Sequence, residues 1–322
     1  MNLQVIVSNQ TNPYWNVAVE NYLVSRRVDD TVVMYLWKNH RTVVIGQNQN
    51  PFAECNVDAL LADGGYVMRR TTGGGAVYHD DGNINFSFVA PYTLYDQQRQ
   101  FDVIREALAD YGLTVELSGR NDLLCNGRKF SGNAFSKGQY QRLHHGTILI
   151  KGNIDDLSRY LKVRPAKLHK HGVASVQSRV VNLSELADIT SDTIVPHLTA
   201  AFERVYGSKA ETVDFDAVKK NMEVVELYQK YSSDEWLYGK WRNFTASRSA
   251  QFEWGAVDIN VTIDESRSLI TDVAIATDAL EVDLADALCS LLVGASSVEA
   301  PDVLSDTPNA ARLKDIVSLI YN

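Results

Sequence analysis

The stretch RRTTGGGAVYHD, residues 69–80, joins two arginines and two threonines to three consecutive glycines, followed by His79 and Asp80. Glycine permits positive φ and close approach to the backbone, but it costs conformational entropy on folding. Backbone N–H groups beside an arginine form a binding site for an anion. The stretch is neither a P-loop nor a dinucleotide loop, because Tyr78 stands where the latter needs its last glycine. A tight turn with a bulge is the alternative, and the flanking charges favour the anion site.

A second candidate is GRKFSGNAF, residues 127–135, which begins within the dipeptide Asn126-Gly127. Asn-Gly is the strongest short hairpin signal, so we expect Lys129 at a fixed position just past a tight turn. A lysine ammonium is a compact charge with three donors and can contact a carboxylate and a phosphate together. A solvated lysine beside a turn is the alternative.

The preceding segment SGRND, residues 118–122, supplies two further polar candidates. Asn121 can cap the turn or bind an amide, and capping is the favoured interpretation. Asp122 is a candidate ligand for magnesium, which binds carboxylate oxygens.

Two basic or histidine-containing segments follow. In HHGTILI, residues 144–150, His145 could orient a ligand at the start of a strand, although packing is favoured. The segment LKVRPAKLHKHG, residues 161–172, places Lys167 among several basic side chains. It could close as a lid over a triphosphate or be a solvated loop.

Charge is distributed unevenly along the chain. The net charge is −9, which argues against nucleic acid as a partner, yet residues 120–180 carry +9 and the remainder carries −18. This polarisation favours an anionic ligand or an acidic partner surface. The three cysteines, Cys55, Cys125 and Cys289, lie far apart, so neither a disulfide framework nor a zinc site is indicated. Each is expected to be a small buried hydrophobe.

The chain of 322 residues is too long for one typical core. Hydrophobic periodicity and turn residues predict strands over 3–7, 83–90, 144–152, 252–263 and 268–276, a hairpin of 32–37 with 42–46, and helices over 13–27, 97–111, 281–294 and 309–321. Residues 155–238 are predicted to be mostly helical. The polar stretch 241–251 is expected to be a linker.

These elements predict a mixed α/β (α+β) protein with a large domain over 1–242 and a small C-terminal α/β domain over 250–322. No apolar run approaches the length of a membrane span, and MNLQVIVSNQ lacks the layout of a signal peptide. We therefore expect a cytoplasmic protein without a membrane partner.

Taken together, RRTTGGGAVYHDDGNINFSF, SGRND, GRKFSGNA, HHGTILI and SVQSRVVNL occur in an order that resembles the lipoate-protein ligase A family. The likeness also includes NPYWNVAVE and TVVIGQNQNPFAECN before these motifs and QFEWGAVDINV after them. The resemblance implies a large catalytic domain with mixed sheets flanked by helices, related to biotin ligases, and a small C-terminal domain that moves during catalysis. It also implies the reaction, in which lipoate and ATP give lipoyl-adenylate and pyrophosphate before the lipoyl group passes to a lysine of an acceptor domain.

The resemblance assigns roles residue by residue. Contacts to the activated ligand fall on Arg70, Gly75, Ala76, Val77 and Tyr78, the catalytic lysine is Lys129, and Lys167 lies in the loop that covers the adenylate. We also expect His79, Asn121 and His145 to contact lipoate or ATP, and Asp122 to bind Mg²⁺. The implied partners are lipoyl-acceptor domains of dehydrogenase E2 subunits and the glycine cleavage H protein, and a monomer is expected.

Two features depart from the family pattern. The joint WRNFTASRSA differs from the shorter, proline-containing joint of the family, and Cys125 lies near the hairpin of Lys129. Because sister enzymes of the same fold transfer acyl groups through a cysteine thioester, an ATP-independent octanoyl or lipoyl transferase stays an alternative. A non-catalytic lipoate-binding protein is the other.

Overall fold

The computed structural model describes residues 1–119, 121–162, 180–239, 244, 246–264, 266–280, 283–298 and 310–321. The chain divides into two compact units, each of which combines segments that are distant in the sequence. The first comprises Met1–Val44, Asn56–Met68 and Val77–Ser233, and the second comprises Ile45–Cys55, Arg69–Ala76 and Asp234–Asn322. Of the helices in the described ranges, none has the length and apolar character needed to cross a bilayer.

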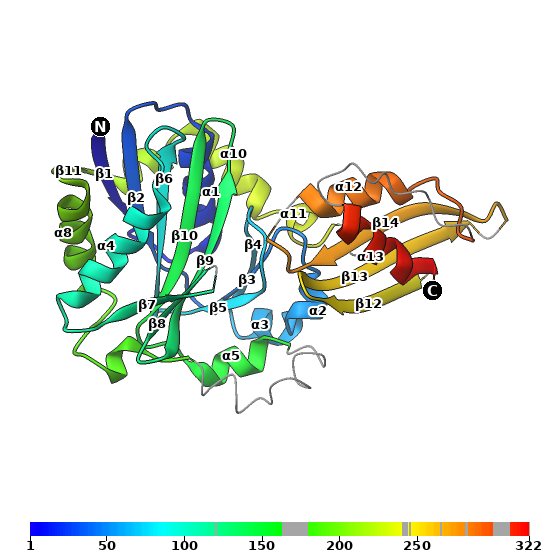
Figure 1. Cartoon of the computed structure of the whole chain (residues 1–322), viewed down its shortest axis with the longest axis horizontal. Helices are drawn as coiled ribbons and strands as arrows, with labels where there is room; N and C mark the ends of the chain where they lie inside the picture. Colours follow the sequence, from blue (N-terminus) through cyan, green and yellow to red (C-terminus); the bar gives the residue numbers. More distant parts are fainter. Residues whose placement is uncertain are drawn as a thin grey trace. The chain divides into compact units, whose positions relative to one another are not determined.

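An eight-stranded mixed sheet forms the centre of the first unit, in the order β11-β1-β2-β6-β10-β9-β8-β7 (Figure 1). Its strands are β1 (Asn2–Val7), β2 (Thr31–Trp37), β6 (Asn83–Pro91), β7 (Val115–Ser118), β8 (Asp122–Cys125), β9 (Arg128–Lys137), β10 (Gln141–Leu149) and β11 (Ala210–Val213). Strand β1 is parallel to β2 and β11, and the pairs from β2 to β7 are antiparallel. The mixed α/β prediction is confirmed.

Helices cover both faces of this sheet, which explains why β2 and β6 are buried along their whole length. The helices and the 3₁₀ turn of the unit are α1 (Pro13–Ser25), α3 (Val57–Ala62), α4 (Gln97–Ala109), α5 (Ile154–Tyr160), η1 (Leu183–Glu185), α8 (Ile194–Tyr206), α9 (Phe215–Lys219) and α10 (Met222–Tyr231). Alternate residues of β2 serve opposite faces. Met34 joins the apolar cluster that contains Phe101 and Phe202 of α4 and α8, whereas the hydroxyl of Tyr35 donates to Asn16 of α1.

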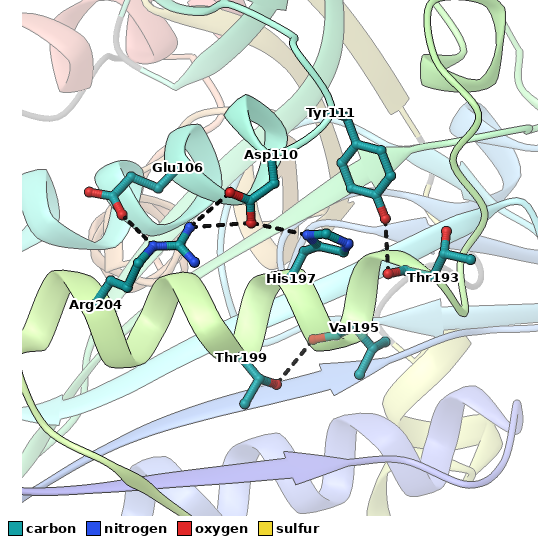
Figure 2. A network of polar contacts seen from close by, with 8 residues as sticks. All are labelled: Glu106, Asp110, Tyr111, Thr193, Val195, His197, Thr199 and Arg204. Atoms are coloured by element: carbon teal, nitrogen blue, oxygen red, sulfur yellow. Dashed lines mark hydrogen bonds and ion pairs between the residues drawn. The ribbon is translucent and has the colours of Figure 1, made fainter.

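A polar network joins α4 to α8 (Figure 2). Arg204 donates to Glu106 and to both carboxylate oxygens of Asp110, and His197 Nδ1 lies 3.0 Å from the same Asp110. At one end, the hydroxyl of Tyr111 donates to the carbonyl oxygen of Thr193. The network holds the exposed edges of two helices whose apolar sides share one core.

Several predicted elements are confirmed. Helix α1 begins at Pro13 with Asn12 as its N-cap, and its side chain accepts from Tyr14 N. Helix α4 ends near Gly112, whose φ of +73° is one that glycine adopts without a steric penalty. Strand β11, in contrast, lies inside the region that was predicted to be mostly helical.

The predicted hairpin of residues 32–37 with 42–46 is wrong. Strand β2 is bordered by β1 and β6, so neither of its edges can accept another strand. The chain leaves it and forms β3 (Thr42–Ile45) in a three-stranded sheet with β4 (Tyr66–Arg69) and β5 (Val77–His79). Occupied edges, which depend on strands distant in the sequence, decided this pairing.

The C-terminal part of the second unit is an antiparallel sheet with two helices. Its elements are β12 (Ala246–Phe252), β13 (Gly255–Asp264), β14 (Leu269–Thr277), α12 (Asp283–Leu292) and α13 (Ala310–Tyr321), and the unit also holds α2 (Pro51–Glu54) and α11 (Asp234–Tyr238). Part of the stretch predicted as a linker is therefore strand β12. Strand β12 lies at a sheet edge, where polar residues such as Ser249 and Gln251 are exposed. These polar residues made the stretch look like a linker in the sequence.

Candidate active site

The hairpin of β8 and β9 presents Lys129. Asn126 and Gly127 have φ of +51° and +71°, the conformation of a two-residue type I′ turn, and Cys125 pairs with Arg128 across it. The predicted hairpin is confirmed. Lys129 lies opposite Leu124, one residue beyond the turn pair.

The Lys129 side chain lies across the sheet toward Asp122. Its Nζ is 2.7 Å from Asp122 Oδ1, and the two side chains are 40% and 35% exposed. Gly132, which pairs with Asp122, leaves room for this path, because a Cβ there would lie 3.2 Å from Nζ. The ammonium is thus oriented by a carboxylate while it is still open to an anionic ligand.

Asn121 ties the start of β8 to β9. Its Nδ2 donates to Asn133 O over 2.9 Å, and Asn133 N donates back to Asn121 O over 2.9 Å. This contact joins two strands, and the capping of the turn that the sequence favours for Asn121 stays a prediction. Its contact with lipoate or ATP stays a prediction.

Arg69 and Arg70, in the second unit, bind the chain's own backbone. The guanidinium of Arg69 donates to carbonyl oxygens of Gln47, Gln49 and Leu237, and burial lowers its pKa to about 10. Arg70 is buried and donates to Thr72 Oγ1 and to the carbonyl oxygens of Gly73 and Gly75. Arg70 therefore shapes the glycine loop here, and its contact with phosphate stays a prediction.

The three glycines meet three different demands. Gly73 lies so close to the C-terminal part of its unit that a Cβ would be 2.3 Å from Ala279 O. Gly74 has φ of +97° and donates its N–H to the same carbonyl oxygen over 3.0 Å. Gly75 has open space where its Cβ would be, and Ala76 after it is half-buried. Of these three glycines, Gly75 alone has open space at its Cβ position, and its contact with a ligand stays a prediction.

Val77–His79, near the end of the stretch RRTTGGGAVYHD, form strand β5 in the first unit, and this strand pairs with β3. Val77 is exposed, and the buried Tyr78 donates its hydroxyl to Asp156 over 3.4 Å. Burial, together with nearby Asp156, raises the pKa of Tyr78. The ring of His79 is buried, with Nδ1 3.3 Å from Asn39 Nδ2.

His145 belongs to a buried polar cluster that sequence reasoning missed. Its Nδ1 lies 2.9 Å from Glu20 Oε1, and this carboxylate also accepts from Ser87 Oγ over 2.5 Å. Ser87 in turn accepts from Trp37 Nε1 over 2.9 Å. Glu20 is 1% exposed in the apolar helix VAVENYL, and a carboxylate among such residues was the available signal.

The structure thus groups the predicted residues by unit. Lys129, Asp122 and Asn121 come together on one hairpin of the first unit, and Arg70 and Gly75 belong to the glycine loop of the second. Lys167 lies outside the described residues. Within the described ranges, no group of three or more metal-ligating side chains is present.

Comparison with known proteins extends these observations to the whole chain. Residues 12–203 match the family model of the lipoyl protein ligase A/B catalytic domain, and residues 242–315 match that of the bacterial lipoate protein ligase C-terminus. The chain is 38% identical over 296 residues to lipoate-protein ligase A of Psychrobacter cryohalolentis, covering 89% of this chain and 87% of the relative. It is 37% identical over 299 residues to that of Bdellovibrio bacteriovorus, covering 91% and 88%.

Solved structures share the fold. The structure of P. falciparum LipL1 in complex with lipoate is 29% identical, covers 99% of both chains and has a TM-score of 0.82. The bipartite lipoate protein ligase of Thermoplasma acidophilum, solved with its E2 lipoyl domain, is 25% identical with a TM-score of 0.65 and covers 76% of this chain and 100% of its own. The first family model spans more than half of the chain, and the relatives exceed 30% identity over most of their length. The chain therefore belongs to the lipoate-protein ligase A family.

Proposed function

We propose that the chain activates lipoate with ATP and then transfers the lipoyl group to a lysine of an acceptor domain. The observation that carries this proposal is the half-exposed ammonium of Lys129, held 2.7 Å from Asp122 beside a rigid hairpin turn. It is supported by the relatives named lipoate-protein ligase A and by a solved lipoate-protein ligase A bound with ATP.

In the first step, a carboxylate oxygen of lipoate attacks the α-phosphorus of ATP. The bond from that phosphorus to the bridging oxygen breaks, and pyrophosphate leaves with the electron pair. Two anions must approach each other, so a fixed cation stabilises the transition state in which their charges meet. Lys129 supplies that cation.

In the second step, the amine of the acceptor lysine attacks the lipoyl carbonyl carbon. AMP leaves with the electrons of the anhydride bond, the amine loses a proton, and an amide remains. Arg70 holds the phosphate, and Lys167 is assigned to the shielding of the anhydride from water. The proposed contacts to the lipoyl-adenylate are Gly75, Ala76, Val77, Tyr78, His79, Asn121 and His145.

Asp122 is the proposed protein ligand of Mg²⁺. Magnesium in nucleotide sites is bound by one or two carboxylates together with phosphate oxygens and water. A single carboxylate that is 35% exposed fits this requirement. When bound, the ion would neutralise charge on pyrophosphate, while Lys129 acts on the reacting centre.

The proposed acceptors are the lipoyl domains of dehydrogenase E2 subunits and the glycine cleavage H protein. The basic segment 120–180 favours an acidic acceptor surface. A monomeric, cytoplasmic protein with domains over 1–242 and 250–322 stays our prediction.

The test is lipoate-dependent release of pyrophosphate, followed by mass spectrometry of apo acceptor domains. We expect Lys129→Ala to lower the rate of pyrophosphate release about 10²- to 10³-fold, as for removal of one group that stabilises developing charge. Lys137→Ala, at the exposed end of the same strand, is the matched control and should leave the rate unchanged. Wild-type protein that is folded yet neither releases pyrophosphate nor modifies any acceptor would refute the proposal.

A further inference from the structure

His144, the neighbour of the predicted site residue His145, is a fully buried histidine with two polar contacts. Its Nδ1 is 3.0 Å from Gln100 Oε1, and its Nε2 is 2.9 Å from Asn133 Oδ1. Both partners are oxygen acceptors, whereas a neutral imidazole has only one N–H. In one of the two contacts, the partner of the imidazole must therefore be an amide N–H group instead of an amide oxygen.

A doubly protonated ring would satisfy both oxygens, but the surroundings oppose it. The ring of His144 is packed against Phe86, Phe101 and Phe135. Burial, with a smaller effect from His145, lowers the pKa of His144 to about 3. His145 is the titratable group that acts on His144, and a protonated His145 would further disfavour protonation of His144. The imidazole is neutral at pH 7.

The orientation of the Asn133 amide decides which nitrogen carries the proton. Asn133 Nδ2 donates to Asn121 O over 3.0 Å and to Ser131 Oγ over 3.2 Å. A half-turn of this amide would bring its oxygen against the carbonyl oxygen of Asn121. Asn133 Oδ1 must therefore face His144, and His144 Nε2–H donates to it.

His144 Nδ1 is then an acceptor, and Gln100 has a donor to offer. Gln100 Nε2 and the hydroxyl of Tyr206 are buried and, within the described residues, have no hydrogen-bond partner. Burial raises the pKa of Tyr206, and Gln100 has a smaller opposing effect. If the Gln100 amide is turned by half a turn, Nε2 donates to His144 Nδ1 and gains the partner that it otherwise lacks.

The far end of this hydrogen-bond chain is the hairpin of Lys129. Asn133 and Asn121 are joined by three hydrogen bonds, and Asp122, the partner of Lys129, follows Asn121 directly. Gly146 pairs with Asn133 across β10 and β9, and a Cβ there would lie 2.4 Å from Asn133 Oδ1. The motif HHG thus supplies both the donor to Asn133 and the room for its side chain.

We propose that His144, as the neutral tautomer protonated at Nε2, is a positioning residue that holds Asn121 and Asp122 opposite Lys129 through Asn133. The kinetic part rests on the proposed ligase function, whereas the tautomer does not. In this arrangement, the contact of His144 with Asn133 affects the rate of the reaction. The contact of His144 with Gln100 affects only the stability of the fold.

Nitrogen-15 NMR of the wild-type protein tests the tautomer without any assay of activity. We expect the proton of the His144 ring on Nε2 and none on Nδ1 at pH 7. A proton on Nδ1 alone, or on both nitrogens, would overturn the proposal even if the ligase activity were established.

Two variants test the asymmetry between the sides of the ring. His144→Phe keeps an aromatic ring but removes the donor to Asn133, and we expect kcat of pyrophosphate release to fall about tenfold, with KM for lipoate within about threefold. Gln100→Leu removes the partner of Nδ1, and we expect a similar loss of stability but kcat within about twofold of wild type.

Equal losses of kcat in the two variants would mean that His144 is only structural and would overturn the proposal, as would an unchanged kcat in His144→Phe. If His144→Phe does not fold, Asn133→Asp replaces it, because that side chain can accept from His144 but cannot donate to Asn121 O. We expect the same loss of kcat from it. A wild-type protein without pyrophosphate release would instead count against the ligase function.

Discussion

Cys125 stands four residues before Lys129 in the sequence, yet its thiol belongs to the core. It is 1% exposed and packs in the cluster that includes Leu123 and Phe130. Burial raises the pKa of this thiol, so the thiolate needed for a thioester is disfavoured at neutral pH. At the residue scale, Cys125 lies beside the hairpin of Lys129 but is buried, and the prediction of a small buried hydrophobe is confirmed for Cys125.

The substitution Cys125→Ser checks this assignment. We expect rates of pyrophosphate release and lipoyl transfer within about twofold of wild type, and a free energy of unfolding lower by about 1–2 kcal/mol, because a hydroxyl replaces an apolar group in the core. Denaturant unfolding and the acceptor assay measure the two quantities. A folded variant that no longer transfers the lipoyl group would support the thioester mechanism instead.

At the scale of elements, α4 and α8 combine a shared apolar core with the polar network of Figure 2. A hydrogen bond from His197, assisted by Arg204, holds the pKa of Asp110 below its usual range. Because the folded pKa is lower than the unfolded one, the charged form stabilises the fold above the unfolded pKa. That contribution is lost as the pH falls through the lowered pKa.

The variant Asp110→Asn isolates this contribution. We expect it to lower the free energy of unfolding at pH 7 by about 0.5–1 kcal/mol, since these side chains are partly exposed and screened by solvent. The difference from wild type should shrink as the pH falls below about 4. Urea unfolding across that range measures it, and a difference that persists at the lowest pH would contradict the role of the charge.

At the scale of the whole molecule, short segments from the N-terminal half fold with the C-terminal part in one unit. Thr277 N donates to Asn48 O over 3.0 Å, and Gly74 N donates to Ala279 O over 3.0 Å. The glycine loop is therefore packed on residues that lie some two hundred positions later in the chain. Gly73 and Gly74 serve this packing, whereas Gly75 does not contact these residues through its Cβ position.

The variants Gly73→Ala and Gly75→Ala test whether the packing at Gly73 stabilises the fold. At Gly73 the added methyl group meets the carbonyl oxygens of Ala279 and Leu280, so we expect a loss of about 1–3 kcal/mol of stability from overpacking. Gly75→Ala, with open space at its Cβ, is the control and should change stability by less than about 0.5 kcal/mol. Equal melting temperatures for the two variants would show that the contact at Gly73 does not contribute to stability.

Local sequence determined the features that depend on neighbouring residues. The dipeptide Asn126-Gly127 favours a type I′ turn, because both positions of that turn need positive φ. The turn fixes the position of Lys129, which follows it two residues later. Pro13 and Gly112 likewise mark helix ends through their own backbone preferences. The order of the motifs also sufficed to identify the family.

Tertiary structure decided the pairings between residues distant in the sequence. Strand β3 joined a different sheet from β2, because β1 and β6 occupy both edges of β2. Glu20 contacts His145, and Arg70 donates to carbonyl oxygens of the glycine loop. Buried polar groups need hydrogen-bond partners, and the fold decides which partners lie within reach. Hydrophobic periodicity and turn residues describe a chain's local preferences and carry no information about such partners, so only the folded chain could supply them.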